Sequence, residues 1–407
     1  MAGPLTGVKV LDLSRVLAGP WCGQVLADMG ADVIKVEKPV VGDDTRQWGP
    51  PFLKDSNGNN TDDAAYFHSA NRGKKSIVVN IQTSEGQKII RDLVASSDVL
   101  IENYRVDALK KYGLNYASLR EINPKLIYCS ITGFGQTGPY KDRSGYDFMI
   151  QGMGGLMSIT GHADGQDGGG PMKTGVAISD LTTGMYAAIG ILGALHERHQ
   201  SGEGQYIDMS LLDVQVAWLA NQNMNYLIGG DAPLRKGNTH PNIVPYQVFP
   251  TQDGHIIVTV GNDKQFKDFA DVIAEPHLAT DTRFSSARAR VENREAIVPL
   301  IEAALAKNTS LFWLTEMEKS QVPAGPINDI KQVFADPQVI ARGMQFDLPH
   351  EIAGTVPQVA NPIRYSKSKL EYKSASPTLG QNTDEVLKEM GLSAQDIEVL
   401  RQKSIIE

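Results

Sequence analysis

Short runs of β-branched and aliphatic residues alternate with helical patterns through the first 135 residues. Five runs have the apolar character of strands buried on both faces of a parallel sheet, namely VKVLDLS (8–14), DVIKVEKP (32–39), KSIVVNI (75–81), DVLIENY (98–104) and KLIYCSITGFG (125–135). The helices between them have recognisable ends, with Pro20 near a first turn, Gly30 after a last turn and the capping pattern Ser84-x-x-Gln87. This alternation predicts an α/β fold with a mostly parallel, doubly wound sheet.

The pattern changes after the last of these runs. A long helix is expected at 179–200, followed by the strand-like QYIDMSL and a second helix around 211–227. A polar stretch rich in Gly and Pro begins near 229, and a hairpin and charged amphipathic helices follow it to about 343. We expect a large domain in residues 1–228, a linker and a smaller α+β domain in 229–344, and a last segment in 345–407.

Composition limits the classes of function. The 407 residues are 41% hydrophobic and 21% charged with a formal net charge of -8, so no overall cationic field would gather nucleic acid or an anionic membrane surface. The longest apolar stretch, 185–195, is shorter than the roughly 20 residues of a membrane span, and the N-terminus lacks the apolar core of a signal peptide. Cys22 and Cys129 are expected to be buried reduced thiols. We expect a cytoplasmic protein without nucleic-acid or membrane partners.

Several familiar site patterns are missing. The turn after the first run reads SRVLAGPWCG and lacks the GxGxxG spacing, which disfavours nicotinamide or flavin binding. The patterns GxxxxGK[ST], HExxH and GxSxG are also absent, and no residues have the spacing of a metal site. We expect no metal.

Basic residues stand at or just after the ends of the predicted strands. They are Arg15, Lys38, Arg72, Lys74, Lys75, Arg105, Lys110 and Lys111. Ligands of open α/β sheets bind outside the carboxyl ends of the strands, where cations and helix N-termini meet phosphates. A polyanionic nucleotide such as CoA would fit there. Most lysines and arginines are solvated surface charges, so this pattern alone leaves both interpretations open.

Asp180 precedes a long apolar helix in the string GVAISDLTTGMYAAIGILGAL. Asp is among the commonest N-cap residues, because its carboxylate accepts a hydrogen bond from a free first-turn N–H, and the local pattern favours that role. The same place suits a nucleophilic carboxylate, because a helix N-terminus favours the ionised form and nearby amides can stabilise an oxyanion on a thioester.

Strings along the whole chain resemble one family in the correct order. They include PLTGVKVLDLSRVLAGP, LADMGADVIKVEKP, GDDTRQWGPPF, NRGKKSIVVNI, SITGFGQTGPYKDRSGYD, ISDLTTGMYAA and SGEGQYIDMSLLD. The chain thus resembles the class III CoA-transferases, also called the CaiB/BaiF family. The resemblance implies a Rossmann-like large domain completed by residues 345–407, a small domain joined by linkers, and an interlocked homodimer. It also implies that Asp180 is the nucleophile.

The resemblance also implies a CoA site. Its expected residues are Val16, Lys38, Ala70, Asn71, Lys74, Asn103, Tyr104, Arg105, Lys111, Ser144, Gly145, Tyr146 and Asp147. Lys38 stands where arginine is common in relatives, so a point charge replaces a bidentate phosphate contact. Trp48 resembles positions near the acyl end of the pocket, although it would also suit a core. His240 is a further candidate for the substrate pocket, although a packed or solvated imidazole is commoner.

Two alternatives to the transferase remain from the sequence. α-Methylacyl-CoA racemases resemble this chain in fold but pair the aspartate with the histidine of a GHD string. The corresponding string here is GYD, and a phenol, with its ordinary pKa of about 10, is a poor base at neutral pH. The racemase or isomerase is therefore one alternative, and a non-catalytic CoA-binding protein is the other.

The strings RQWGPPF, NYLIGG, GNTHPNIVPYQVF and TVGNDKQF resemble most the succinyl-CoA:glutarate CoA-transferase branch. The resemblance then implies CoA transfer from a succinyl-CoA-like donor to a dicarboxylate such as glutarate. Asp180 would attack the donor thioester to form a mixed anhydride, and the CoA thiolate would return to give an aspartyl-CoA thioester. The acceptor would repeat these steps in reverse, without a metal.

Overall fold

The computed structural model describes residues 2–407 and divides them into two compact units. The first unit contains the chain up to Leu156, Thr174–Gly230 and Gln338–Glu407, and the second contains Met157–Lys173 and Asp231–Pro337. The expected division had placed 157–173 in the large domain. In the structure Arg235 donates a hydrogen bond to the Ser158 carbonyl at 3.3 Å, and the Gly237 N–H donates to the Gly161 carbonyl at 3.0 Å. These contacts attach the segment to the second unit.

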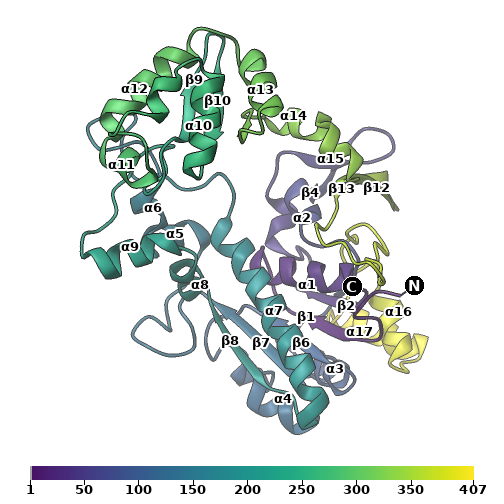
Figure 1. Cartoon of the computed structure of the whole chain (residues 1–407). Helices are drawn as coiled ribbons and strands as arrows, with labels where there is room; N and C mark the ends of the chain where they lie inside the picture. Colours follow the sequence, from purple (N-terminus) through teal and green to yellow (C-terminus); the bar gives the residue numbers. More distant parts are fainter. Residues whose placement is uncertain (1) are drawn as a thin grey trace. The chain divides into compact units, whose positions relative to one another are not determined.

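A six-stranded sheet forms the centre of the first unit (Figure 1). Its strands are β1 (Lys9–Asp12), β2 (Asp32–Glu37), β5 (Lys74–Val78), β6 (Val99–Glu102), β7 (Ile127–Thr132) and β8 (Tyr206–Ser210). Every neighbouring pair is parallel, in the order β5-β2-β1-β6-β7-β8. The predicted parallel α/β fold is confirmed, and the order is that of a doubly wound Rossmann sheet.

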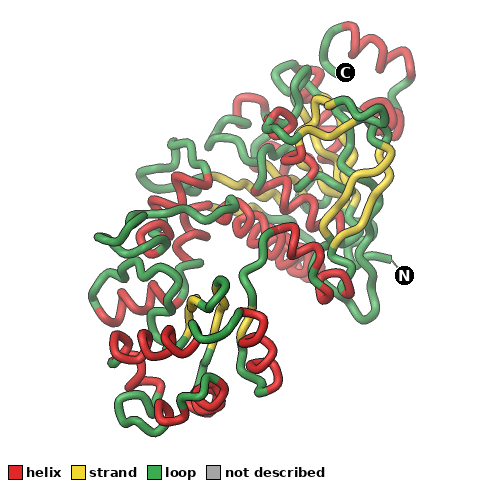
Figure 2. Tube along the Cα trace, turned by 90° about the horizontal axis from the view of Figure 1, so that it is seen from above, coloured by secondary structure: helices red, strands yellow, loops and turns green. Residues whose placement is uncertain are grey.

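Helices cover both faces of this sheet because each strand alternates its apolar side chains (Figure 2). Val10, Val99 and Ile101 join the core under α1 (Ala18–Asp28) and α7 (Ile178–Ser201). Leu11 and Leu100 point the other way and contribute to the core under four helices, α3 (Ser84–Ala95), α4 (Tyr116–Ile122), α16 (Thr383–Glu389) and α17 (Ala394–Gln402).

The C-terminal segment lies against the first strands of the sheet (Figure 1). The Asn382 N–H donates to the Ser76 carbonyl at 2.9 Å, and the Asn80 N–H donates to the Ile405 carbonyl at 2.8 Å. Before α16 and α17 the segment forms an antiparallel hairpin of β12 (Gln345–His350) and β13 (Gly354–Val359).

The structure differs from the sequence prediction in three elements. The helix expected at 211–227 is two helices, α8 (Leu211–Ala217) and α9 (Asn221–Gly229), because the chain turns at Ala220 with φ of 45°. Helix α3 is capped one residue earlier than predicted, since the Thr83 hydroxyl accepts the Gly86 N–H at 3.1 Å. The hairpin of β3 (Phe52–Lys54) and β4 (Asn60–Ala64) was not predicted.

The remaining elements of the first unit are short. They are α2 (Ala65–His68), α5 (Asp147–Met153), the 3-10 turns η1 (Asp44–Gln47) and η2 (Lys110–Tyr112), and α6 (Leu156–Ile159) and α15 (Pro337–Ala341), which span its boundaries with the second unit.

The second unit has its own core around a small antiparallel sheet. Its elements are β9 (Tyr246–Pro250), β10 (His255–Thr259), α10 (Asp263–Val272), η3 (Pro276–Ala279), α11 (Ala287–Glu292), α12 (Arg294–Leu305), α13 (Ser310–Lys319), β11 (Ala324–Gly325) and α14 (Ile330–Ala335). The predicted hairpin is β9 and β10. Arg290 is fully buried there, where it donates to the Val244 and Phe284 carbonyls.

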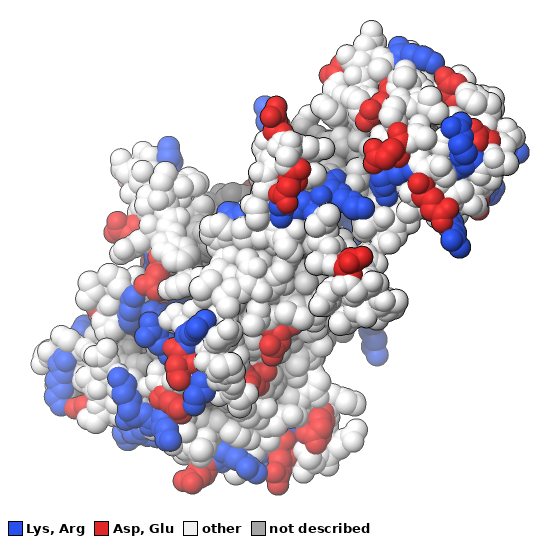
Figure 3. All heavy atoms as spheres, turned by 90° about the vertical axis from the view of Figure 1, so that its left-hand side faces the viewer, with Lys and Arg blue, Asp and Glu red and all other residues white. Residues whose placement is uncertain are grey.

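Helix α7 is long and apolar enough, by length and composition alone, to cross a membrane, and half of its most apolar window is buried. Ala187 and Ile191 belong to the core that it shares with α1 and the sheet. Packing against the sheet therefore accounts for much of its apolar character. On the molecular face drawn in Figure 3, basic and acidic side chains are interspersed.

Candidate active site

The carboxyl ends of β1 and β6 form the topological switch point of the sheet. From β1 the chain proceeds to β2 on one side, and from β6 it proceeds to β7 on the other. Ligands of doubly wound sheets bind in the crevice at this point. The loops that follow β1 and β6 carry five of the predicted CoA-site residues, namely Val16, Asn103, Tyr104, Arg105 and Lys111.

The loop after β1 is held in an unusual conformation. Val16 has φ of 71°, a left-handed conformation that is costly for a β-branched residue. Its N–H points at both carboxylate oxygens of Asp43, each at 3.2 Å. Next to it, the Arg15 N–H donates to the Asn103 side-chain oxygen at 2.9 Å, and the Asn103 amide donates to the Arg15 carbonyl at 2.6 Å. Asn103 thereby ties the loops after β1 and β6 together.

Asp43 is ionised in this site. Burial alone would raise its pKa, but the charge of Lys35 and hydrogen bonds from Lys35 and Thr45 hold the pKa at about 2. The Lys35 ammonium lies 2.8 Å from the Asp43 carboxylate, and both side chains are buried. This fixed anion anchors the Val16 N–H.

A basic cavity of about 300 Å³ opens beside these loops. It is lined by Arg15, Lys38, Tyr104 and Lys111 among others. Asp44 positions two of the cations, since its carboxylate accepts from Lys38 at 2.6 Å and from Arg15 at 3.2 Å. The Arg15 guanidinium also lies 5.5 Å from the centre of the Tyr104 ring. The cavity thus offers cations and an aromatic face for a phosphorylated nucleotide.

Three further predicted residues lie together but are buried. Ala70 and Asn71 follow α2, and the Asn71 side-chain amide donates to the Phe67 carbonyl at 2.9 Å. The Lys74 ammonium donates to the Asp12 carboxylate, the Pro20 carbonyl and the Asn71 side-chain oxygen, each within 3.0 Å. These three acceptors use all the donors of Lys74, so in this structure it braces the start of α1.

Part of the predicted basic cluster lies at the opposite edge of the sheet. Arg72, Lys74 and Lys75 stand at the start of β5, not at its carboxyl end, because the strand begins at Lys74. Of the three, only the Lys74 side chain reaches the carboxyl end of β1, where it contacts Asp12. Arg72 pairs with the buried Asp28 at 2.7 Å. The assignment of Arg72 and Lys75 to a carboxyl-end cluster is therefore wrong.

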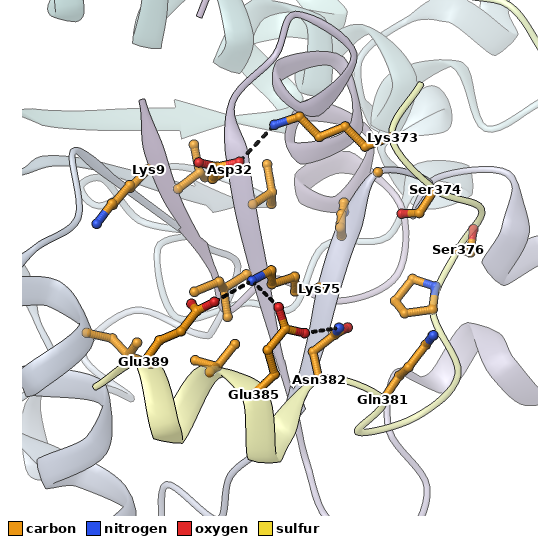
Figure 4. Close-up of a pocket in the computed structure, with 18 of the residues that line it drawn as sticks. Lys9, Asp32, Lys75, Lys373, Ser374, Ser376, Gln381, Asn382, Glu385 and Glu389 are labelled. Carbon is orange, nitrogen blue, oxygen red and sulfur yellow. Dashed lines mark hydrogen bonds and ion pairs between the residues drawn. The ribbon is translucent and has the colours of Figure 1, made fainter. Parts of the chain in front are cut away.

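The amino ends of the strands border a cavity of about 750 Å³, drawn in Figure 4. Two of its lysines are already paired: Lys75 contacts Glu385 at 2.7 Å and Glu389 at 3.2 Å, and Lys373 contacts Asp32 at 2.8 Å. The cavity is large, but neither Asp180 nor the loop residues of the switch point line it.

Asp180 lies in the first turn of α7 and does not cap it. The N-cap position belongs to Ala177, which makes no side-chain cap. Asp147 of α5 takes that role, because its Oδ1 accepts the Ser179 N–H at 2.7 Å and the Asp180 N–H at 3.3 Å. The local interpretation of Asp180 as a helix cap is wrong, and its carboxyl group is left for another purpose.

The first turn of α7 is fixed by α5 and α8. Gln151 donates to Asp147 Oδ2 at 2.6 Å and accepts the Thr174 N–H at 3.0 Å. The Ser179 hydroxyl donates to Gln215 of α8 at 2.7 Å. Neighbouring helices thus hold the backbone that carries Asp180, as a preorganised reacting group requires.

The environment of Asp180 changes its acidity. Burial, followed by the charge of Asp147, raises the pKa of Asp180 to about 7. A raised pKa makes the ionised carboxylate more basic and a better nucleophile.

Tyr66 belongs to α2, and Trp48 directly follows η1. Burial and the charges of Asp180, Asp147 and Asp43 raise the pKa of Tyr66 to about 12, which indicates that this phenol is near the carboxylates. The Trp48 ring meets the Tyr66 ring edge-on, with 5.3 Å between ring centres. Trp48 was predicted from the sequence, whereas Tyr66, which stands four residues before Ala70 in an otherwise ordinary string, was not.

The last predicted residues lie on the loop after β7 and in the second unit. Gly145 packs on Gly133 so closely that a methyl group added to either would lie within 2.5 Å of the other's Cα. Ser144 is exposed, and Tyr146 is 65% exposed at the start of α5. His240 belongs to the second unit, where its Nδ1 accepts the Asn242 N–H at 3.1 Å.

Comparison with known proteins identifies the family. The model described as CoA-transferase family III matches residues 5–383. The chain belongs to this family. The succinate–glutarate CoA-transferase of Agrobacterium fabrum is 54% identical over 387 residues, which cover 95% of this chain and 96% of that protein. The succinyl-CoA:glutarate CoA-transferase of Homo sapiens is 44% identical over 387 residues, which cover 95% and 86%.

A solved structure supports the same conclusion. The crystal structure of a CAIB/BAIF family protein from Brucella suis is 50% identical, covers 96% of this chain and all of that one, and has a TM-score of 0.84. The predicted family is confirmed, and the chain is a class III CoA-transferase.

Proposed function

We propose that this class III CoA-transferase moves CoA from a succinyl-CoA-like donor to a dicarboxylate such as glutarate through covalent intermediates on Asp180. The observation that carries the proposal is that two aspartates have different roles at the start of α7. Asp147 satisfies the first-turn amides of α7, so Asp180 remains a half-buried carboxyl with a raised pKa. The relatives named for succinate, succinyl-CoA and glutarate supply the substrate class.

The proposed reaction starts when an Asp180 carboxylate oxygen attacks the thioester carbonyl of the donor. The carbon–sulfur bond breaks, the CoA thiolate leaves, and a mixed anhydride forms. The thiolate then attacks the Asp180 carbonyl carbon and releases the donor as a free carboxylate, which leaves an aspartyl-CoA thioester. The carboxylate of the acceptor displaces the thiolate, and the thiolate finally attacks the acceptor carbonyl. The acceptor leaves as its CoA ester and Asp180 returns as a carboxylate.

The basic cavity provides a place for the nucleotide end of CoA. Lys38, Lys111 and Arg15 bring three positive charges to the carboxyl ends of the strands, and the Tyr104 ring lies among them. Charge-assisted contacts with phosphates would hold the nucleotide while the thioester reaches toward α7. Lys74, in contrast, would support this site by holding Asn71 and the start of α1.

The test is an exchange assay with isotope-labelled acceptor. Succinyl-CoA and glutarate should yield glutaryl-CoA and succinate, and Asp180→Asn should reduce the rate by at least about 10⁴-fold, since the nucleophile is lost. Asp213→Asn alters an exposed aspartate in the first turn of α8 and should keep full activity. If the glutarate carboxylates carry heavy oxygen, mass spectrometry should find that oxygen in the Asp180 peptide after turnover. Turnover without label in that peptide would contradict the covalent mechanism.

A separate measurement of α-proton exchange tests the racemase alternative. Tyr146 stands where racemases carry a histidine, and its ring is mostly exposed at the start of α5. Exchange of the α proton of a methyl-branched acyl-CoA with heavy water, without CoA transfer, would favour the racemase.

We also propose that the enzyme is a homodimer, as the family resemblance implies. An apolar groove of about 890 Å³ lies between α1, α7 and the β12–β13 hairpin of the first unit. Trp21, Met185, Ile189 and Leu192 line it, and Ile189 is 60% exposed in the single chain. A second copy of the chain would cover such a surface, which is rarely left open in a soluble monomer.

A further inference from the structure

The loop 103–112 has cavities on two sides. One is the basic cavity that we assign to the nucleotide. The other, of about 260 Å³, is lined by Arg105, Asp107 and Lys110 of this loop and by the ends of β6 and β7. Glu102, the last residue of β6, is among the residues that line this second cavity.

Glu102 is a buried carboxyl that the transfer mechanism does not use. It is 5% exposed, and its Oε2 accepts the Tyr104 N–H at 2.7 Å. Tyr104 lines the nucleotide cavity, and its N–H is the second amide after β6. Glu102 therefore fixes the conformation with which the chain leaves the strand and enters the loop that carries Tyr104, Arg105 and Lys111.

Glu102 is also connected to the loop after β7. It lies opposite Ser130 in the parallel register of β6 and β7, and the Ser130 side chain acts to lower the pKa of its carboxyl group. The Gln136 side chain donates to the Ser130 hydroxyl at 3.0 Å, and the Gln136 N–H donates to Asp208 at 3.0 Å. Gln136 belongs to the loop that continues to Ser144 and Gly145.

Burial raises the pKa of Glu102 to about 7, although the Ser130 side chain, the Tyr104 N–H and the Tyr128 side chain act to lower it. Three rings pack around this network, with 5.6 Å between the centres of Tyr128 and Tyr206 and 5.4 Å between those of Tyr116 and Tyr206. A carboxyl buried among rings weakens the fold, and such groups concentrate at functional sites.

We propose that Glu102 is a positioning residue for CoA: its carboxyl group fixes the loop 103–112 and, through Ser130 and Gln136, couples it to the loop after β7. This inference rests on the proposed function, because it assumes that the loop 103–112 binds the nucleotide. Glu102 itself does not touch the substrate. It acts through the Tyr104 N–H that its carboxyl group accepts and through Ser130, its partner in the register of β6 and β7.

The test compares two variants of similar size. Glu102→Gln keeps an oxygen that accepts the Tyr104 N–H, and its KM for succinyl-CoA should stay within about threefold of the wild type. Glu102→Met removes the acceptor, leaves the N–H unsatisfied, and should raise this KM by about tenfold while kcat falls by less than about threefold. A purely structural role would lower the amount of folded enzyme and leave KM unchanged.

Ser130→Ala gives an independent measurement if Glu102→Met does not fold. It retains the buried carboxyl but breaks the link to Gln136, and we expect a KM for succinyl-CoA about threefold higher with kcat unchanged. Provided that the wild type is active, the inference is overturned if KM is unchanged in both Ser130→Ala and folded Glu102→Met. If Glu102→Met does not fold, an unchanged KM in Ser130→Ala alone overturns it. Failure of the proposed function looks different, since the wild type would then transfer no CoA.

Discussion

Two aspartates at the start of α7 illustrate how position sets chemistry at the scale of single residues. Asp147 accepts two backbone N–H groups, whereas Asp180 accepts none that would hold its charge. The pKa of about 7 therefore belongs to the aspartate that we propose as the nucleophile. Below this pH the free enzyme carries a protonated Asp180, so we expect kcat/KM to rise as pH increases through 7.

Asp147→Asn should lower the pH at which kcat/KM rises. The change removes a negative charge that raises the pKa of Asp180, while the amide oxygen still accepts the Ser179 N–H. We expect the pKa seen in the pH profile of kcat/KM to fall by up to about one unit. Asp147→Ala removes the cap as well, and should cost about 1 kcal/mol of stability in urea unfolding. An unchanged pH profile in Asp147→Asn would show that this charge does not control Asp180.

Adjacent lysines should differ widely in their effect on stability. Lys74→Ala leaves Asp12 buried without its partner and should reduce the free energy of unfolding by about 3–5 kcal/mol. Lys75→Ala breaks only partly exposed pairs with Glu385 and Glu389, and should cost less than about 1 kcal/mol. Urea denaturation of both variants measures the contrast, and equal losses would be inconsistent with it.

At the scale of elements, the contact between α1 and α7 positions the site. Gly184 lies one turn after Asp180, and a methyl group there would lie 2.5 Å from the Ala18 carbonyl. The backbone of α7 can approach the start of α1 this closely because residue 184 has no side chain. The same contact brings the first turn of α7 toward the loop that contains Val16.

Two glycines of α7 give a matched pair of variants. Gly184→Ala forces the helices apart and should reduce the free energy of unfolding by about 1–3 kcal/mol, with a loss of kcat because Asp180 moves. A methyl group added at Gly193 would point into open space, so Gly193→Ala should stabilise the helix by up to about 1 kcal/mol. Urea unfolding with activity measurements checks both, and a neutral Gly184→Ala would refute the proposed close contact.

At the scale of the whole molecule, the exposed apolar groove bears on oligomeric state. We expect light scattering to give twice the chain mass of 44.3 kDa. Ile189→Glu places a charge in the groove and should shift the protein toward a monomer. Ile122→Glu alters an exposed isoleucine of α4 outside this groove and should leave the mass unchanged. A wild-type monomer would contradict the homodimer.

The sequence by itself determined the strands of the central sheet, the parallel α/β class and the family, because continuous apolar runs and ordered motifs are local properties. It also indicated Asp180, Lys38, Tyr104 and Lys111. Tertiary structure alone decided which aspartate caps α7, since Asp147 lies 33 residues before Asp180 and the fold brings them together. It also decided that the Lys74 ammonium pairs with Asp12, that Glu102 accepts the Tyr104 N–H, and that the charges of Asp180 and Asp147 act on Tyr66. Hydrogen bonds and charges depend on distances in space, which spacing along the chain does not contain.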